Sequence, residues 1–239
     1  MPTLPDANGR RQERKLKIAQ AAVRLFEKRG LAATTVEMIA AEAGISPRTF
    51  FRYFDTKESA AFPDHDLRVA DMERRLDARL PSRDPLADAV EVSRRSALEF
   101  FDNPELYHRR YRLLRSNEVL RNLERVFDRR YEERLVAFLT ACEIEWVTAC
   151  ACAAAFVGVV NAALDVWAQS SRTNPRPATT ALNSGLQLVR DAFTNVVRAP
   201  SDDADGSPAP LTVFVAPDDP LRAELLAAVQ RGATVSQRT

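Results

Sequence analysis

A single glycine between two short helical patterns is the feature that most constrains how this chain can fold. After Thr34 or Thr35 as an N-cap, apolar side chains recur at the spacing of one helix face: Val36, Ile39, Ala40 and Ala43. Gly44 ends this pattern, because glycine readily adopts the left-handed conformation that a sharp turn needs. Ser46 is then expected to cap a second helix, with Pro47 in its first turn. The stretch predicts two helices that meet at a tight corner.

The second helix is predicted to bury one face and to present hydrogen-bond donors on the others. Phe50 and Phe54 are four residues apart and are expected to point inward together. Two outward rows have the same spacing: Arg48 with Arg52, and Thr49 with Tyr53. Arginine reads guanine edges in the major groove, and hydroxyl groups hold phosphates. The pattern therefore predicts a helix-turn-helix that binds DNA.

The residues after this helix extend the basic surface. Asp55 and Glu58 have the spacing of a capping box, so they predict the start of a third helix. Lys57 falls in its first turn, where exposed N–H groups and the ammonium together favour a backbone phosphate.

The run from about Ile18 to Leu67 resembles the N-terminal domain of TetR-family (AcrR-like) transcriptional regulators. The matching residues are AAVRLFEKRGLAATTVEMIAAEAGISPRTFFRYFDTKESA. The resemblance implies base contacts chiefly from Arg48 and Arg52, and phosphate contacts from four residues: Thr35, Thr49, Tyr53 and Lys57. Phe51 replaces the tyrosine that is common in the family, which leaves an apolar contact with a thymine methyl in place of a hydroxyl contact.

Charge is distributed unevenly along the 239 residues. The whole chain has a formal net charge of +1, but residues 9–57 contain eleven Lys and Arg against five Asp and Glu. That segment therefore has a net charge of +6 and the remainder −5. The basic excess coincides with the helix-turn-helix, as phosphate neutralisation requires. Residues 1–11 are expected to be a flexible arm that either contacts DNA or is simply solvated.

Nothing in the sequence predicts an enzyme. No phosphate-binding loop, dinucleotide fingerprint, zinc-protease motif or nucleophile elbow is present, so no catalytic residue, cofactor or metal is expected. Cys150 and Cys152 would point about 200° apart on a helix, which favours packing over chelation. Three cysteines, together with an N-terminus that lacks an apolar export segment, favour a cytoplasmic protein.

Helical patterns without strand alternation predict an all-α fold. A helix over 12–29 and the helix-turn-helix would form a three-helix DNA-binding domain at 12–62, followed by a larger helical-bundle ligand and dimerisation domain at 63–198. The predicted bundle helices are 64–80, 85–101, 104–116, 118–141, 145–171 and 179–197. Residues 199–210 read as an acidic linker, and a C-terminal strand-plus-helix extension is predicted from 211 onward, within 199–239.

The most apolar run, 146–164, is long enough to raise the question of a membrane span. Its alanine content and its acidic flanks, Glu145 and Asp165, argue against membrane insertion. The resemblance implies that the helices at 145–171 and 179–197 form a homodimer interface. The alternative is that they form the core of a monomer.

The resemblance also implies an effector pocket in the helical body, whose occupant weakens DNA binding. Its candidate lining residues are Phe101, Tyr107, Tyr111, Arg112, Phe138, Asn161 and Trp167. Ordinary core packing or exposure is the alternative for each of them. Arg112 is the candidate anchor for an acidic group, unless it belongs to a solvated face. The apolar lining favours a hydrophobic or amphipathic effector.

These expectations describe a repressor that binds a palindromic DNA operator as a homodimer and is released by a small molecule. Two alternatives remain open. One is a helical interaction or activator protein whose helix-turn-helix does not act as a ligand-released repressor, and the other is a helical enzyme.

Overall fold

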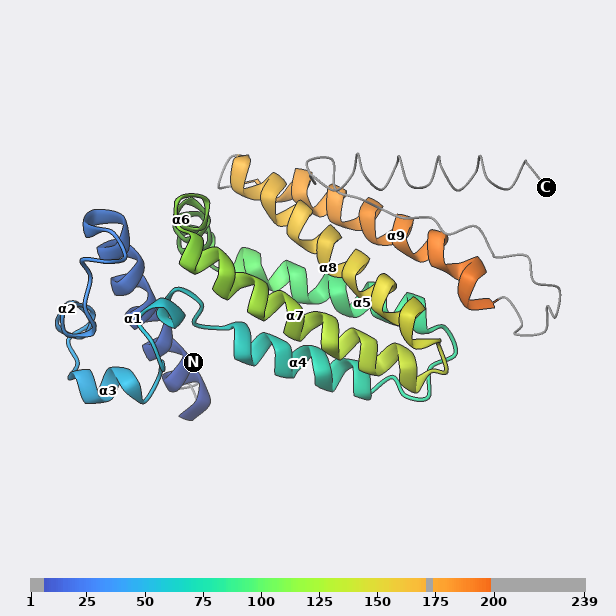
Figure 1. Ribbon diagram of the computed structural model, residues 1–239, viewed down its shortest axis with the longest axis horizontal. Coiled ribbons are helices and arrows are strands. Elements are labelled where there is room, and N and C mark those ends of the chain that lie inside the picture. Colours follow the sequence, from blue (N-terminus) through green and yellow to red (C-terminus); the bar gives the residue numbers. More distant parts are fainter. Residues whose placement is uncertain (1–6, 171–173, 199–239) are drawn as a thin grey trace, which may run out of the picture. The chain divides into compact units, whose positions relative to one another are not determined.

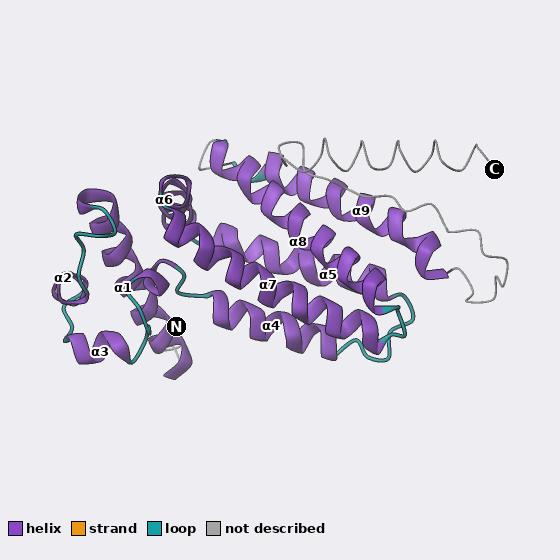
Figure 2. Cartoon of the chain, in the orientation of Figure 1, coloured by secondary structure: helices purple, strands orange, loops and turns teal. Residues whose placement is uncertain are grey.

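The computed structural model describes residues 7–170 and 174–198, which belong to one compact unit, Met1–Ala199. These residues form helices joined by short loops, and no strand occurs among them (Figures 1 and 2). The elements are α1 Ala7–Arg29, α2 Val36–Glu42, α3 Pro47–Phe51, η1 Glu58–Ala61, α4 His65–Asp77, α5 Pro85–Leu98, η2 Glu99–Asp102, α6 Pro104–Ser116, α7 Glu118–Ala141, α8 Trp146–Gln169 and α9 Arg176–Arg198. The all-α prediction is confirmed for this part of the chain. The predicted linker, strand and helix at 199–239 lie outside the described residues.

The predicted corner between α2 and α3 is present. Thr35 caps α2 by accepting a hydrogen bond from the Met38 amide at 3.3 Å, and Ser46 caps α3 by accepting one from the Thr49 amide at 3.1 Å. Gly44 has a φ of +69°, the left-handed conformation expected of it. These local hydrogen bonds fix where both helices begin.

The prediction that Asp55 and Glu58 form a capping box after α3 is wrong. Ser59 and Thr56 form the reciprocal pair instead: the Ser59 amide donates to Thr56 Oγ1 at 3.1 Å, and the Thr56 amide donates to Ser59 Oγ at 3.3 Å. Hydroxyl groups satisfy these amides as well as a carboxylate would. The segment they start is the short 3-10 helix η1, and the next α-helix begins only at His65.

Two boundaries at the N-terminal end differ from expectation. α1 begins at Ala7, inside the segment predicted to be an arm. α3 ends at Phe51, so Phe54 reaches the core from the turn that follows, where its amide donates to Phe50 O at 3.1 Å. Both phenylalanines are buried, and their ring centroids are 5.6 Å apart.

The apolar core of the N-terminal helices continues into the body. Ile18, Phe26 and Phe50 belong to one cluster with side chains from the body: Leu106 and Leu114 of α6, and Leu120 and Phe127 of α7. The division at residue 62 stays a prediction, because side chains of α6 and α7 share the core of the N-terminal helices.

The body helices form a second cluster, in which α8 packs against α9. The two helices run side by side in Figure 1, and their close approach depends on Gly185. A Cβ at this position would lie 2.6 Å from Val159 Cγ1. Of the helices described, α8 is long and apolar enough to span a membrane by length and composition, a test that core helices of soluble proteins also pass. Its inner side chains, including Cys152 and Phe156, are fully buried in the body.

Candidate functional site

The outward side of α3 carries the side chains predicted to contact DNA. Arg48 and Arg52 are exposed, whereas Phe50 between them is fully buried. Thr49 and Tyr53 are half-buried, and the Arg52 guanidinium lies 5.3 Å from the centroid of the Tyr53 ring. A buried phenylalanine thus fixes the rotation of α3 and directs both arginines toward solvent.

Two residues outside α3 border the same surface. Thr35 is exposed at the start of α2, and Arg11 of α1 lies 5.2 Å from the centroid of the Tyr53 ring. Arg11 was predicted to lie in a flexible arm, but the helix holds it beside Tyr53. Phe51, where the sequence departs from the common tyrosine, is 54% exposed on α3.

Lys57 is engaged within the protein. Its ammonium donates to Leu31 O at 2.7 Å and to Thr34 O at 2.9 Å, both in the loop before α2. A lysine ammonium has three donors, and these two bonds use two of them. Lys57 therefore holds the loop that carries Thr35, whether or not it also contacts a phosphate.

The body contains a cavity of about 250 Å³ between α4, α5, α6, α7 and α8. Tyr107, Tyr111 and Asn161, which were predicted to contact an effector, line it. The rest of its lining combines apolar and ionisable side chains: His65, Met72, Ser93, Ser96, Ala97, Phe100, Arg110, Leu114, Arg115, Arg121, Glu124, Asp128, Tyr131, Leu135, Phe156, Val157, Val160, Leu164 and Asp165.

The other four predicted lining residues lie outside this cavity. Phe101 packs edge-on against Trp167, with ring centroids 4.4 Å apart, and Trp167 is itself buried behind Tyr107. Phe138 belongs to the main body core. Arg112 is exposed, and its guanidinium is 2.8 Å from Glu27.

Sequence reasoning missed the charged wall of the cavity. Arg110 was not predicted to line the cavity, yet it is only 4% exposed and lies in the cavity wall. Its spacing from Tyr107 was the available signal, because residues three apart on a helix share a face. Glu124 and Asp128 are four residues apart on α7 and face the same cavity. An isolated acidic pair on a helix usually marks a solvated face, so nothing in the pattern distinguished it.

Burial changes the ionisation of this wall. It raises the pKa of the Glu124 carboxyl to about 7, against an opposing effect from Arg110. Burial also raises the pKa of Asp128 to about 6, although the Asn161 amide donates to its carboxylate at 3.0 Å. For His65, burial and then the Arg110 charge lower the pKa well below the usual 6.5. His65 is therefore neutral at neutral pH, and Glu124 is only partly ionised.

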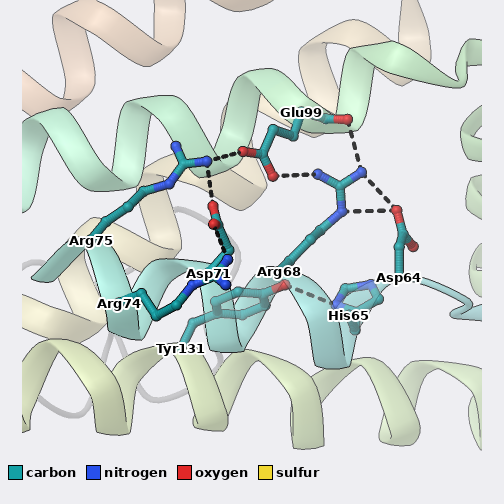
Figure 3. A network of polar contacts seen from close by, with 8 residues as sticks. All are labelled: Asp64, His65, Arg68, Asp71, Arg74, Arg75, Glu99 and Tyr131. Carbon is teal, nitrogen blue, oxygen red and sulfur yellow. Dashed lines mark hydrogen bonds and ion pairs between the residues drawn. The ribbon is translucent and has the colours of Figure 1, made fainter. Parts of the chain in front are cut away.

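A polar network joins the first turns of α4 to the cavity wall (Figure 3). Arg68 contacts Asp64 at 2.6 Å and donates to Glu99 O at 2.8 Å. His65, one residue after Asp64, is 3.3 Å from the Tyr131 hydroxyl of α7, and both rings line the cavity. Burial opposes ionisation of Asp64, but the Arg68 charge prevails and lowers the pKa of that carboxyl. Because α4 follows α3 and η1 in the chain, this network links the cavity wall to the helix that comes directly after them.

Comparison with known proteins identifies the N-terminal helices. Residues 18–59, which include α2, α3 and their turn, match the family described as bacterial regulatory proteins, tetR family. This N-terminal segment is similar to the TetR family. The exposed arginines of α3, Arg48 and Arg52, lie within the matched segment.

Two curated relatives align with part of the chain. The HTH-type transcriptional regulator YerO of Bacillus subtilis is 47% identical over 47 residues, 20% of this chain and 16% of that protein. A protein named as the mycofactocin biosynthesis transcriptional regulator MftR, from Mycobacterium tuberculosis, is 31% identical over 93 residues. The alignment covers 39% of this chain and 46% of that protein. The chain therefore spans less than half the length of these curated relatives.

Solved structures share the fold over most of the chain. NalD, the secondary repressor of the MexAB-OprM multidrug efflux pump in Pseudomonas aeruginosa, has a TM-score of 0.52 at 18% identity and covers 74% of this chain and 96% of its own. FadR of Bacillus subtilis, in complex with stearoyl-CoA, has a TM-score of 0.52 at 19% identity, with 73% and 96% covered. A complex of SmeT with triclosan has a TM-score of 0.51 at 20% identity, with 84% and 100% covered. At these sequence identities, the similarity to the three structures shows that the fold is shared and nothing further.

Among residues 7–170 and 174–198, no group of three or more His, Cys, Asp or Glu side chains is placed to hold a metal ion. The three cysteines are free thiols.

Proposed function

We propose that this chain is a ligand-responsive transcriptional repressor that acts in the cytoplasm. It binds a palindromic operator as a homodimer, and a small hydrophobic or amphipathic effector in the body cavity releases it. The observation that carries the proposal is the exposure of Arg48 and Arg52 on α3, with Phe50 behind them in the core. Reading base edges in the major groove requires long donors on the outer face of a well-anchored helix.

The DNA contacts are divided by side-chain chemistry. Arg48 and Arg52 are assigned to base edges, where a bidentate guanidinium distinguishes guanine. Thr35, Thr49 and Tyr53 are assigned to phosphates, which position the helix without reading sequence. Lys57 is assigned a phosphate contact through its remaining donor, in addition to its two bonds to the loop before α2.

The exposed face of α8 supports the homodimer. Trp146 is 64% exposed and Val147 61% exposed, and Leu188 of α9 is 58% exposed. Between the ends of α8, the exposed residues are mostly small: Ala151, Ala154, Gly158 and Ala162. Small side chains let two helices approach closely, and apolar exposure of this extent is typical of a surface that another subunit covers.

The cavity supports effector control. It lies inside the body, and its wall includes His65 and Tyr131 at the start of α4 and on α7. The related structures of SmeT and FadR hold triclosan and stearoyl-CoA, respectively. An occupant that repositions α4 would change the separation of two reading helices, with a coupling free energy on the order of 1–3 kcal/mol.

Fluorescence anisotropy tests the DNA-binding part of the proposal. The probe is a labelled duplex from the region upstream of the protein's own gene, with a shuffled duplex as the non-specific reference. We expect Arg48→Ala and Arg52→Ala to remove about 1–3 kcal/mol each of preference for the specific duplex. Arg129→Ala is the matched control, because Arg129 is an exposed arginine of α7 paired only with Glu133. Unchanged sequence preference in the double variant would overturn the assignment of base contacts.

A further inference from the structure

Arg110 is an unusual residue for a cavity wall. Its side chain is buried, and its guanidinium lies over three aromatic rings, at 5.3 Å from the Phe62 centroid, 5.7 Å from Phe100 and 5.2 Å from Tyr107. No residue that the structure describes accepts a hydrogen bond from this guanidinium, and its Nε is completely buried. Arg110 therefore presents a charge and several donors to the cavity that the protein itself does not pair.

Burying an unpaired guanidinium is unfavourable. Arginine does not deprotonate in proteins, so Arg110 stays charged and the free-energy cost of its desolvation remains. The three rings offset part of the desolvation through cation–π attraction, but they do not satisfy the N–H groups. An anion placed against Arg110 would satisfy both the charge and the donors.

Three other charged side chains of the cavity wall have hydrogen-bond partners: Asp128, Asp165 and Arg121. Asp128 accepts a hydrogen bond from Asn161 at 3.0 Å, and Asp165 accepts one from Tyr111 and faces Arg115. Arg121 donates to Leu114 O at 3.0 Å and to Arg115 O at 3.1 Å.

Glu124 differs from Arg110 because its carboxylate can lose its charge by taking up a proton. Burial raises the pKa of its carboxyl to about 7, so it takes up a proton in the range where Arg110 stays charged. Arg110 is thus the one buried arginine on the described wall of the cavity, and no described residue accepts a hydrogen bond from it or forms an ion pair with it.

We propose that the effector is a compact amphipathic anion whose carboxylate pairs with Arg110. Its apolar part lies against the aliphatic side of the cavity formed by Leu135, Val157, Val160 and Leu164. The cavity volume of about 250 Å³ is just below the roughly 300–1,000 Å³ of most ligand pockets, which favours a short chain or a single ring system. This inference rests on the proposed function, because it names the ligand class of the same cavity.

Three probes with the same apolar chain test the charge preference: octanoate, octan-1-ol and octylamine. Isothermal titration calorimetry on the full-length protein without DNA, at pH 6.0, where Glu124 is mostly protonated, gives their dissociation constants. We expect octanoate to bind most tightly, octan-1-ol about 10- to 100-fold more weakly, and octylamine more weakly still, because a charged hydrogen-bonded pair is lost or replaced by repulsion.

Two methionine variants locate the effect. Arg110→Met removes the buried charge while keeping a long apolar side chain, and we expect it to weaken octanoate binding about 10- to 100-fold. Binding of octan-1-ol by the same variant checks that the cavity is intact and is expected to stay within about twofold of the parent. Arg112→Met is the matched control, because Arg112 lies outside the cavity and pairs with Glu27 at 2.8 Å. It should leave octanoate binding unchanged.

Several results would overturn the proposal: tighter binding of octylamine than of octanoate, unchanged octanoate affinity in Arg110→Met, or no binding of any of the three probes. An anisotropy titration of the protein–DNA complex with octanoate separates this inference from the proposed function. If octanoate binds through Arg110 but does not change DNA affinity, the anion site stands and the release mechanism is wrong.

Discussion

Lys57 stabilises the DNA-binding helices through two main-chain carbonyls as well as through any phosphate it contacts. Its ammonium closes the loop between α1 and α2, where Leu31 and Thr34 provide the acceptors. This position differs from that of Arg52, which is exposed and makes its described contact with the Tyr53 ring. Loss of Lys57 therefore affects the fold, whereas loss of Arg52 affects mainly recognition.

We expect Lys57→Met to lower the free energy of unfolding by about 1–3 kcal/mol, because two carbonyls lose a charged donor. Urea denaturation without DNA measures the change. Arg52→Met is the control and should shift stability by less than about 0.5 kcal/mol, as expected for an exposed side chain. Equal stability of the two variants would show that the Lys57 bonds contribute nothing.

Glu124 makes stability depend on pH. The pKa of its carboxyl is about 7 in the folded protein against a usual 4.5, so between these values the folded chain holds a proton that the unfolded chain has released. The free energy of unfolding therefore falls as pH rises through this window. Asp128, whose pKa is raised to about 6, contributes in the same direction.

Glu124→Gln is expected to raise the melting temperature at pH 8 and to change it little at pH 5, because the amide cannot ionise. Thermal denaturation followed by circular dichroism at the two pH values measures this difference. Glu133→Gln on the same helix is the control, since Glu133 is exposed and pairs with Arg129. A parallel pH dependence in parent and Glu124→Gln protein would contradict the buried environment assigned to Glu124.

At the scale of elements, the long helices are predictable from sequence and the short ones are not. The range predicted for α7 matches the structure, because its apolar period is long and Asn117 caps it. α3 and η1 have too few residues to carry a period, so their ends are decided by local hydrogen bonds such as those of Thr56 and Ser59. The cavity was only partly predictable for a related reason. Which face of α6 turns inward depends on tertiary packing, which buries Arg110 and leaves Arg112 at the surface.

The contact between α8 and α9 gives a prediction about an element. We expect Gly185→Ala to lower the melting temperature, because the new Cβ would meet Val159 Cγ1 at 2.6 Å and valine has little rotational freedom in a helix. Val159→Ala removes this clash, so the double variant should lose less stability than the sum of the single variants. Additive losses in thermal denaturation would show that α8 and α9 separate without strain.

For the whole molecule, the exposed face of α8 and the reading surface of α3 are expected to act together. A palindromic operator offers two half-sites, and a dimer binds both with one association step. The monomer would retain the side chains of α3 but would bind each half-site alone. If the proposed homodimer forms, we expect it to raise DNA affinity without adding a contact to DNA at either half-site.

Ala154→Arg tests this dependence. Ala154 is an exposed alanine in the small-residue face of α8, and we expect an arginine there to shift the protein to a monomer and to weaken specific DNA binding by at least about tenfold. Ala137→Arg places the same residue at an exposed alanine of α7 and should leave the dimer intact. Analytical ultracentrifugation and anisotropy provide the two readouts. A dimeric Ala154→Arg protein would place the interface elsewhere.

Leu114 of α6 lines the body cavity and also packs in the cluster that contains Phe50 of α3. The same cluster contains Leu106, Leu120 and Phe127, all of which follow residue 62 in the chain. A chimera that grafts residues 1–62 onto a foreign sensor body would keep the arginines of α3 but lose these four supporting side chains. We therefore expect a chimera with exchanged operator specificity to fold only when α6 and the first half of α7 are transferred together with residues 1–62.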